Sequence, residues 1–178
     1  MKKFNLQLFA EAVQGKKIIY LFRILKDAKT KPAVTMAFTT ENERSKSKDS
    51  ETTVTKDGSI TTPGAVEIEI SATAILAKGD TLADELEDAM DNDEIIEIWE
   101  ANLDEPIGEG GNKFKGRYYQ GYLTEFTLTS SAEEHVEYEC TFAVNGSGAK
   151  AENGITVSAE QQEVAGYVFT DTTANAGA

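Results

Sequence analysis

The chain is poor in the residues that most often build cross-links and reactive centres. Its 178 residues include one cysteine, Cys140, and one histidine, His135. A single cysteine excludes a disulfide within the chain, which fits a protein made in a reducing compartment. One histidine and one cysteine also cannot supply the four ligands of the usual structural zinc site. We therefore expect a hydrophobic core to stabilise the fold, and 178 residues are enough to build one.

Long apolar runs are missing as well. No run approaches the ~20 residues that a membrane-spanning helix needs, so we predict no membrane span and no membrane partner. Near the N-terminus two lysines precede a short apolar stretch, which permits a secretion signal as one interpretation. Two amide residues interrupt that stretch, and Phe4, Leu6 and Leu8 alternate with polar residues. We therefore favour an extended arm over residues 1–14 that docks on another surface.

Basic residues are scarce in the second part of the chain. The net charge is −14, and residues 79–178 carry twenty-two Asp/Glu against four Lys/Arg, whereas residues 1–78 carry nine against thirteen. An acidic surface repels a polyanion, because tight DNA binding relies on Lys and Arg to displace counterions. The charge therefore excludes a protein that binds DNA tightly. By itself it favours a solvated face that keeps the protein soluble.

No set of residues predicts catalysis or a cofactor. His135 stands just before a predicted strand without a nucleophile beside it, and Cys140 falls in the apolar phase of that strand, where thiols are usually inert. Residues 108–111 and 111–116 have glycine spacings that resemble nucleotide-binding loops. Both segments lack the further glycine or Lys-Ser/Thr pair that those loops require. We predict that the protein is not an enzyme, binds no cofactor and has no dedicated metal site.

Two binding alternatives stay open. Asp91, Asn92 and Asp93 offer oxygen ligands for calcium, although the spacing of the usual calcium loop is absent. Residues 113–122 combine three tyrosines with three basic residues, as a platform for single-stranded nucleic acid does. The acidic surroundings argue against that platform and favour a strand with one wet end.

Alternation of apolar and polar residues predicts a mainly β protein. Residues 136–144 are apolar at every second position, and residues 66–70 alternate apolar with acidic side chains, which is typical of a strand with one wet face. Residues 113–129 predict one long strand or two, with bends permitted at Gly116 and Gly121. The remaining predicted strands cover residues 16–25, 33–39, 52–55, 59–61, 94–101 and 155–157.

One helix is predicted, over residues 81–91. Leu82, Leu86, Ala89 and Met90 recur at helical spacing and form one apolar stripe, while acidic residues occupy the other positions. Thr81 is the expected N-terminal cap. The helix should therefore cover the β core with its stripe and present acid to solvent or to a partner.

Residues 40–58 are predicted to form a long loop or a projecting hairpin. Residues 41–50 are polar and charged and cannot bury apolar surface, so we expect a loop there. Asp57-Gly58 is a hairpin turn signal between two short strands. The last residues, 170–178, are small and polar, and we expect a flexible tail.

Several segments, taken in order, resemble the major tail proteins of lactococcal-type siphophages, which are long-tailed bacteriophages. The resemblance covers roughly residues 15–145, and it is a pattern of segments rather than a catalytic signature. The chain after Asn145 matches least well. The matching segments are Gly15–Leu25, Thr40–Gly58 with Ser45-Lys46-Ser47-Lys48-Asp49, Ile70–Ile75, Lys78–Asp80, Ile95–Trp99 and Lys113–Thr129.

The resemblance implies a tail-tube fold over residues 15–169, a β-sandwich or half-open barrel with one flanking helix. Subunits of this type form rings, expected to be hexameric, by joining their sheets into an inner barrel, and the rings stack into a tube through which DNA is ejected. Joining edge strands between subunits would also protect the open sheet edges. An acidic lumen, lined by acids of the second half of the chain with Glu67 and Glu69 as further candidates, would let DNA slide without sticking.

The implied partners are other copies of the chain and the tape measure, tail terminator and baseplate proteins. DNA would pass without specific binding, and the protein would belong to the virion tail after assembly in the host cytoplasm. Arg44, Lys46, Lys48 and Lys56 are the candidates for contacts between rings, because they are basic whereas the later part of the chain is acidic. The alternative from another class is a monomeric β-rich binding or decoration module.

Overall fold

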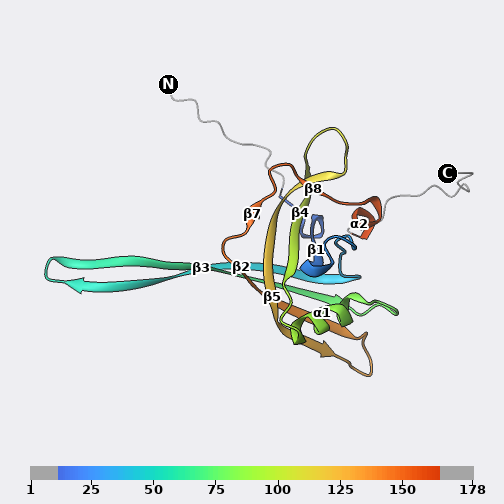
Figure 1. Ribbon diagram of the computed structural model, residues 1–178, viewed down its shortest axis with the longest axis horizontal. Coiled ribbons are helices and arrows are strands. Elements are labelled where there is room, and N and C mark those ends of the chain that lie inside the picture. Colours follow the sequence, from blue (N-terminus) through green and yellow to red (C-terminus); the bar gives the residue numbers. More distant parts are fainter. Residues whose placement is uncertain (1–11, 165–178) are drawn as a thin grey trace, which may run out of the picture.

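The computed structural model describes residues 12–164 (Figure 1). The predicted tail 170–178, and the arm 1–14 apart from residues 12–14, lie outside the described residues. The elements, in chain order, are η1 (Gly15–Lys17), β1 (Ile18–Ile24), η2 (Leu25–Asp27), β2 (Thr39–Thr55), β3 (Gly58–Ile75), α1 (Leu82–Asp91), β4 (Ile96–Pro106), β5 (Lys113–Thr129), β6 (Glu137–Val144), β7 (Ala149–Lys150), β8 (Ile155–Thr156) and α2 (Ala159–Val164).

All strands belong to one antiparallel sheet that curls back on itself. The strand order is β1-β4-β5-β6-β3-β2, and β7 and β8 pair with β5. Three strand spacings in a flat sheet would separate β1 from β6 by about 14 Å. Instead, the rings of Phe22 on β1 and Phe142 on β6 stack with their centroids 5.2 Å apart. The expected mainly β, half-open barrel with one main flanking helix is therefore confirmed.

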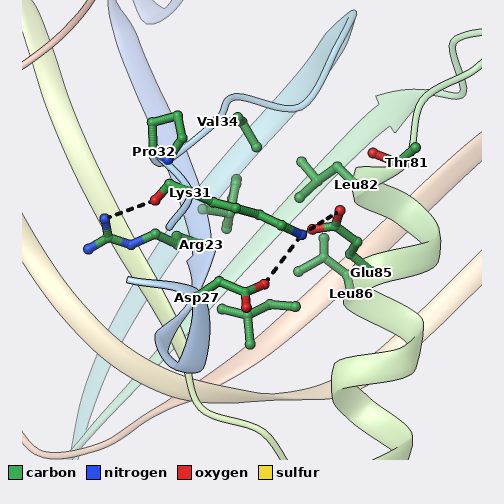
Figure 2. A pocket seen from close by; sticks show the side chains of 11 residues that line it. Arg23, Asp27, Lys31, Pro32, Val34, Thr81, Leu82, Glu85 and Leu86 are labelled. Atoms are coloured by element: carbon green, nitrogen blue, oxygen red, sulfur yellow. Dashed lines mark hydrogen bonds and ion pairs between the residues drawn. The ribbon is translucent and has the colours of Figure 1, made fainter. Parts of the chain in front are cut away.

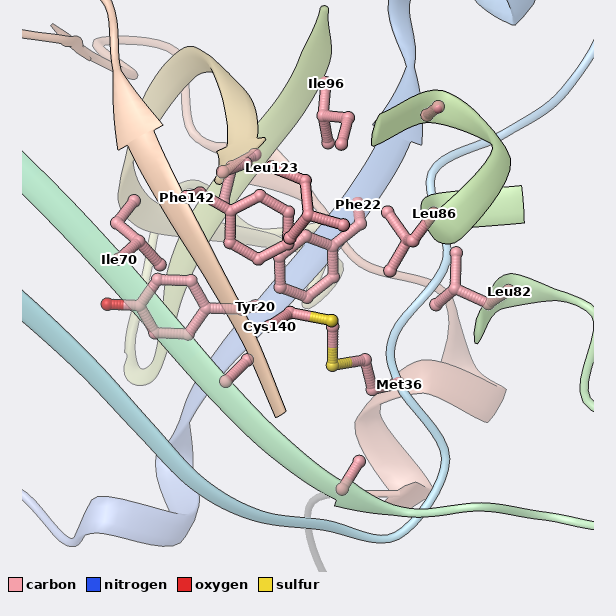
Figure 3. Close-up of a cluster of buried hydrophobic side chains, with 14 of the residues drawn as sticks. Tyr20, Phe22, Met36, Ile70, Leu82, Leu86, Ile96, Leu123, Cys140 and Phe142 are labelled. Carbon is pink, nitrogen blue, oxygen red and sulfur yellow. The ribbon is translucent and has the colours of Figure 1, made fainter. Parts of the chain in front are cut away.

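The core fills the inside of this curl (Figure 3). Alternate residues of β3 and β6 enter it, as their apolar periodicity predicts, and Ile70, Tyr138, Cys140 and Phe142 are all fully buried. A second, smaller cluster lies on the other side of β1 and β4, where Leu21 packs with residues that include Ile155 and Val157. β1 is buried on both faces, which explains why its sequence is almost continuously apolar.

β5 is one long strand that changes partners at Gly121. Gly121 is paired with Ile96 of β4 on one side and with Val144 of β6 on the other. A Cβ atom at this position would lie 2.3 Å from the carbonyl oxygen of Ala143. The glycine that sequence analysis marks as a bend therefore permits the close approach of β6 where β5 passes from one half of the curled sheet to the other.

β2 and β3 form a long hairpin that projects from the body (Figure 1). The predicted loop over residues 41–50 is wrong, because these residues belong to β2 and pair with β3. Their polar sequence is compatible with a strand since both faces of the outer hairpin are exposed. The turn residues are Lys56 and Asp57, and Gly58, with φ of 138°, begins β3.

Two further local predictions are corrected. Thr81 makes no side-chain capping hydrogen bond, and the Asp80 carboxylate instead accepts one from the backbone N–H of Leu82 (2.9 Å). The predicted strand over 33–39 is reduced to an isolated bridge between Val34 and Phe22. In this connection Phe38 adopts φ of 50°, a conformation that breaks an extended strand.

Candidate assembly surfaces

Four strand segments create a continuous acidic face. The register places Glu43, Ser71, Thr141 and Glu125 in one row across β2, β3, β6 and β5, with their side chains directed away from the core. Every second row has the same orientation, and the paired residues of these rows include no lysine or arginine. The seven glutamates of this face are all exposed: Glu41, Glu43, Glu67, Glu69, Glu125, Glu137 and Glu139.

This acidic face ends in two open strand edges. β2 is the last strand of the sheet, so its outer edge has no strand partner in the described part of the chain. β4 accompanies β5 only as far as Gly121, and β6 continues along the other edge to Thr129. Residues 122–129 therefore also present an edge without a neighbouring strand among residues 12–164. Unpaired N–H and C=O groups along such edges are ready to pair with another chain.

Large apolar side chains are exposed at the same two edges. One row of the sheet joins Thr39, Ala74, Tyr138 and Leu128. Ala74 and Tyr138 in the middle are fully buried, whereas Leu128 at the β5 edge is 55% exposed. Phe38, adjacent to Thr39 at the β2 edge, is 66% exposed. The row thus has a buried centre, with an uncovered leucine at its β5 end and an uncovered phenylalanine next to its β2 end.

A charged cluster fixes the base of the hairpin. The Arg44 Nε atom donates a hydrogen bond to the Glu100 carboxylate of β4 over 2.5 Å, and the Tyr20 hydroxyl of β1 donates to the same oxygen over 2.9 Å. Burial, followed by the charge of Glu100, raises the pKa of Tyr20 far above its ordinary value, and the hydrogen bond to Glu100 raises the pKa of Arg44. Arg44 is therefore engaged inside the subunit.

The three lysines of the hairpin are positioned differently. Lys46 and Lys48 lie opposite Ile68 and Val66, on the same face of the hairpin as the buried Ile70. Lys56 lies in the turn. All three are exposed, and within residues 12–164 none of them forms an ion pair. They are accessible for contacts with another molecule, unlike Arg44.

A pocket of about 220 Å³ lies between β1, η2 and α1 (Figure 2). Its floor is apolar and includes Phe22 and Leu86. The Lys31 ammonium group lies between the carboxylates of Asp27 (3.3 Å) and Glu85 (3.0 Å), which ties the β1–β2 connection to the helix. Arg23, which also lines the pocket, pairs with Glu97 outside it, so every charged group of the lining has an ion-pair partner.

The remaining sequence candidates fall in ordinary surroundings. Burial raises the pKa of the Cys140 thiol to about 12, and His135 is exposed on the loop before β6. Tyr118 donates a hydrogen bond to Glu97 (2.6 Å) and Tyr119 is buried, so the two do not form an open stacking platform. The described residues contain no group of three or more His, Cys, Asp or Glu arranged to hold a metal, including at Asp91–Asp93.

Comparison with known proteins decides the family. Residues 12–150 match the protein family described as phage tail tube protein. This chain belongs to that family. It is also 38% identical over 161 residues to a protein of Staphylococcus phage phiMR25 that is assigned as a tail protein, with 87% of this chain and 80% of that protein covered. The chain is accordingly a structural subunit of the tail tube type, as its sequence pattern predicts.

Solved structures show the same fold in tail tube subunits. The SPP1 tail tube subunit matches with a TM-score of 0.69 at 22% identity, over 93% of this chain and 95% of that one. The tail of a gene transfer agent particle, solved with C6 symmetry, matches with a TM-score of 0.60 at 13% identity, over 79% and 99% of the two chains. The tube-terminating cap of the anti-feeding prophage matches with a TM-score of 0.53 at 12% identity, over 83% and 97%.

Within the family fold, sequence reasoning found only part of the acidic face. It singled out Glu67 and Glu69 on β3, and the structure places both on that face. It did not single out Glu125, nor the acids of β2 and β6. Strand alternation is a usable signal for β6, whereas residues 41–50 have no apolar residue and offer none. No helix in the described part of the subunit has the length and apolar character needed to cross a membrane.

Proposed function

We propose that this tail tube subunit assembles into hexameric rings by pairing the outer edge of β2 with residues 122–129 of β5 on the neighbouring subunit. The two edges terminate the same four-strand layer, so one copy after another can extend it around a ring. Pairing would satisfy the unpaired backbone groups of both edges. The C6 symmetry of the structurally similar gene transfer agent tail supports six subunits.

The acidic face would then line the bore. This is the observation that carries the proposal: seven glutamates and no basic residue occupy the one face that lies between the two open edges. A bore of this sign leaves DNA free to slide, since affinity for DNA arises when Lys and Arg neutralise its phosphates. Glu67 and Glu69 remain candidates, now with the five other glutamates of the face.

The stacked rings would form the tail tube of a siphophage virion, assembled in the host cytoplasm, through which DNA is ejected. The tape measure, tail terminator and baseplate proteins are the expected partners of the bore and the two ends. Lys46, Lys48 and Lys56 remain candidates for contacts between rings. Arg44 would act indirectly, by holding the hairpin base against Glu100.

Electron microscopy and sedimentation of the purified chain test this assembly. We expect six-membered rings, and tubes as protein concentration rises. A protein that stays monomeric at high concentration and moderate salt would contradict the proposal and favour the monomeric binding or decoration module. In a reconstruction of the tube, a neutral or basic bore would refute the acidic lining even if rings were present.

The edge pairing has its own test. Replacing Leu128 by proline removes a backbone N–H that points away from β6 toward the open edge, while Thr52→Pro on the outer hairpin leaves the ring edge of β5 intact. We expect the first variant to block ring formation. Because proline can also weaken β5 itself, circular dichroism of the monomer must show that it stays folded. Rings from a folded Leu128→Pro protein would rule out this edge.

A further inference from the structure

The chain contains two Asn-Gly pairs, Asn145-Gly146 and Asn153-Gly154. Both asparagines are exposed, and both glycines have positive φ, 70° and 77°. Before a glycine the side-chain amide of asparagine can approach the next backbone nitrogen closely, because glycine has no Cβ atom to hinder the approach. Sequence alone therefore does not distinguish the two pairs, and their surroundings must.

The backbone around Gly154 is held in place. Its N–H group donates a hydrogen bond to the carbonyl oxygen of Ala151 over 3.1 Å. The next residue, Ile155, is buried and pairs with Phe114 of β5. A Cβ atom at Gly154 would lie 3.2 Å from the Cβ of Lys113, which shows how closely this glycine approaches β5. The nitrogen that follows Asn153 is therefore engaged and cannot turn toward the asparagine without local opening.

The Asn145-Gly146 pair lies in an open connection. The backbone N–H of Asn145 donates to the carbonyl oxygen of Gln120 over 2.7 Å and fixes the chain at the end of β6. Within residues 12–164, neither the side-chain amide of Asn145 nor the N–H of Gly146 takes part in a hydrogen bond. No atom lies within 4 Å of a Cβ atom built on Gly146, and the next strand, β7, begins only at Ala149. The amide and the nitrogen are free to approach each other.

We propose that Asn145 undergoes spontaneous deamidation in the folded protein, whereas Asn153 is protected. The backbone nitrogen of Gly146 gives up its proton to water or hydroxide and attacks the carbonyl carbon of the Asn145 side chain. The new bond closes a succinimide ring, while the bond from that carbon to the amide nitrogen breaks and ammonia leaves with one added proton. Water then adds to either carbonyl of the ring and releases the ring nitrogen, which leaves aspartate or isoaspartate. No group is oxidised or reduced, and water is the only co-reactant.

The reaction changes the charge and the main chain of the subunit. It replaces a neutral amide by a carboxyl group whose ordinary pKa is about 3.9, so one negative charge is added to a chain of net charge −14. The isoaspartate product also inserts a methylene group into the main chain between β6 and β7. The surface at the end of β6 should therefore become more acidic with time, without an enzyme or a partner. This inference does not depend on the proposed ring.

Peptide mapping by mass spectrometry tests the two sites in one molecule. The purified full-length chain is incubated at mildly alkaline pH, and aspartate and isoaspartate are measured at each asparagine over time. We expect conversion at Asn145 to be about tenfold or more faster than at Asn153, the ratio that corresponds to a local opening cost of about 1.4 kcal/mol at Gly154. In concentrated urea, where the hydrogen bond to Ala151 is lost, the two sites should react at similar rates.

Matched glutamine variants identify the source of the new charge. Glutamine keeps the amide but would have to close a larger ring, so Asn145→Gln should remove the acidic form that appears on isoelectric focusing of the aged protein. Asn153→Gln is the control and should leave that form unchanged.

Each alternative result is decisive. Equal rates at the two sites of the folded protein, or faster conversion at Asn153, would overturn the proposal. A preference for Asn145 that persists in urea would show that the local sequence sets the rates and would overturn the protection of Asn153 by the fold. An acidic form that appears at the wild-type rate in Asn145→Gln would overturn Asn145 as its source.

Discussion

Replacing Gly121 by alanine should destabilise the subunit by a calculable amount. The new Cβ atom would lie 2.3 Å from the carbonyl oxygen of Ala143, 3.0 Å from its carbonyl carbon and 3.1 Å from the Cα of Val144. The neighbour is backbone, so β5 and β6 must separate by about an ångström to restore ordinary contact. Gly121 is buried and is paired with strands on both sides, so the shift disturbs two ladders at once.

The expected cost follows from these contacts. Overpacking of a dense interior costs about 1–3 kcal/mol, and a distorted ladder hydrogen bond adds about 1 kcal/mol. The lower chain entropy of alanine in the unfolded state offsets about 0.4–1 kcal/mol of this. The net loss of unfolding free energy should be about 2–3 kcal/mol. For a chain of this length it corresponds to a decrease in Tm of about 5–10 °C.

Urea unfolding of the monomer, followed by the fluorescence of the single tryptophan, Trp99, measures this loss. Gly15→Ala is the matched control, because no atom lies within 4 Å of its added Cβ and its φ is not positive. That control should be unchanged within about 0.5 kcal/mol or slightly stabilised. If Gly121→Ala unfolds at the same urea concentration as the control, the close approach of β5 and β6 at Gly121 is refuted.

Three other perturbations probe the core, the hairpin base and the buried thiol. Phe142→Ala should cost about 3–5 kcal/mol of unfolding free energy, because it removes a fully buried ring that is stacked on Phe22. Urea titration measures this loss, and an effect below about 1 kcal/mol would contradict the closed curl of the sheet. Arg44→Ala should lower the free energy of unfolding by about 2 kcal/mol, because it removes the charged hydrogen-bond donor of Glu100. Lys46→Ala should change the free energy of unfolding by less than about 0.5 kcal/mol. Equal effects would show that the ion pair has no structural role. The unfolded Cys140 thiol ionises at its ordinary value of 9.0, whereas the folded thiol keeps its proton to about pH 12. The contribution of this thiol to stability should therefore be present below pH 9 and decrease as pH rises toward 12. Cys140→Ala should flatten that part of the pH dependence of the unfolding free energy, measured by urea unfolding. An unaltered pH dependence would refute the effect of burial on this thiol.

The sequence by itself determined the elements that local chemistry controls. Strict alternation in residues 136–144 and the helical stripe from Leu82 to Met90 correspond to β6 and α1, because a strand or helix with one buried face must repeat its apolar residues with that period. The ordered segments that resemble tail proteins predict a structural tube subunit, and no set of residues predicts catalysis. The family match then confirmed that assignment.

Only the tertiary structure decided which residues that are distant in the sequence pair with one another. Residues 41–50 lack apolar residues and therefore gave no strand signal, yet they pair with β3 because the hydrogen-bond ladder needs no buried side chains. The acidic face depends on register across four strands, and register is a property of pairing rather than of any one segment. The engagement of Arg44 with Glu100 arises because the sheet curls until β2 reaches β4, a curvature that no local pattern encodes.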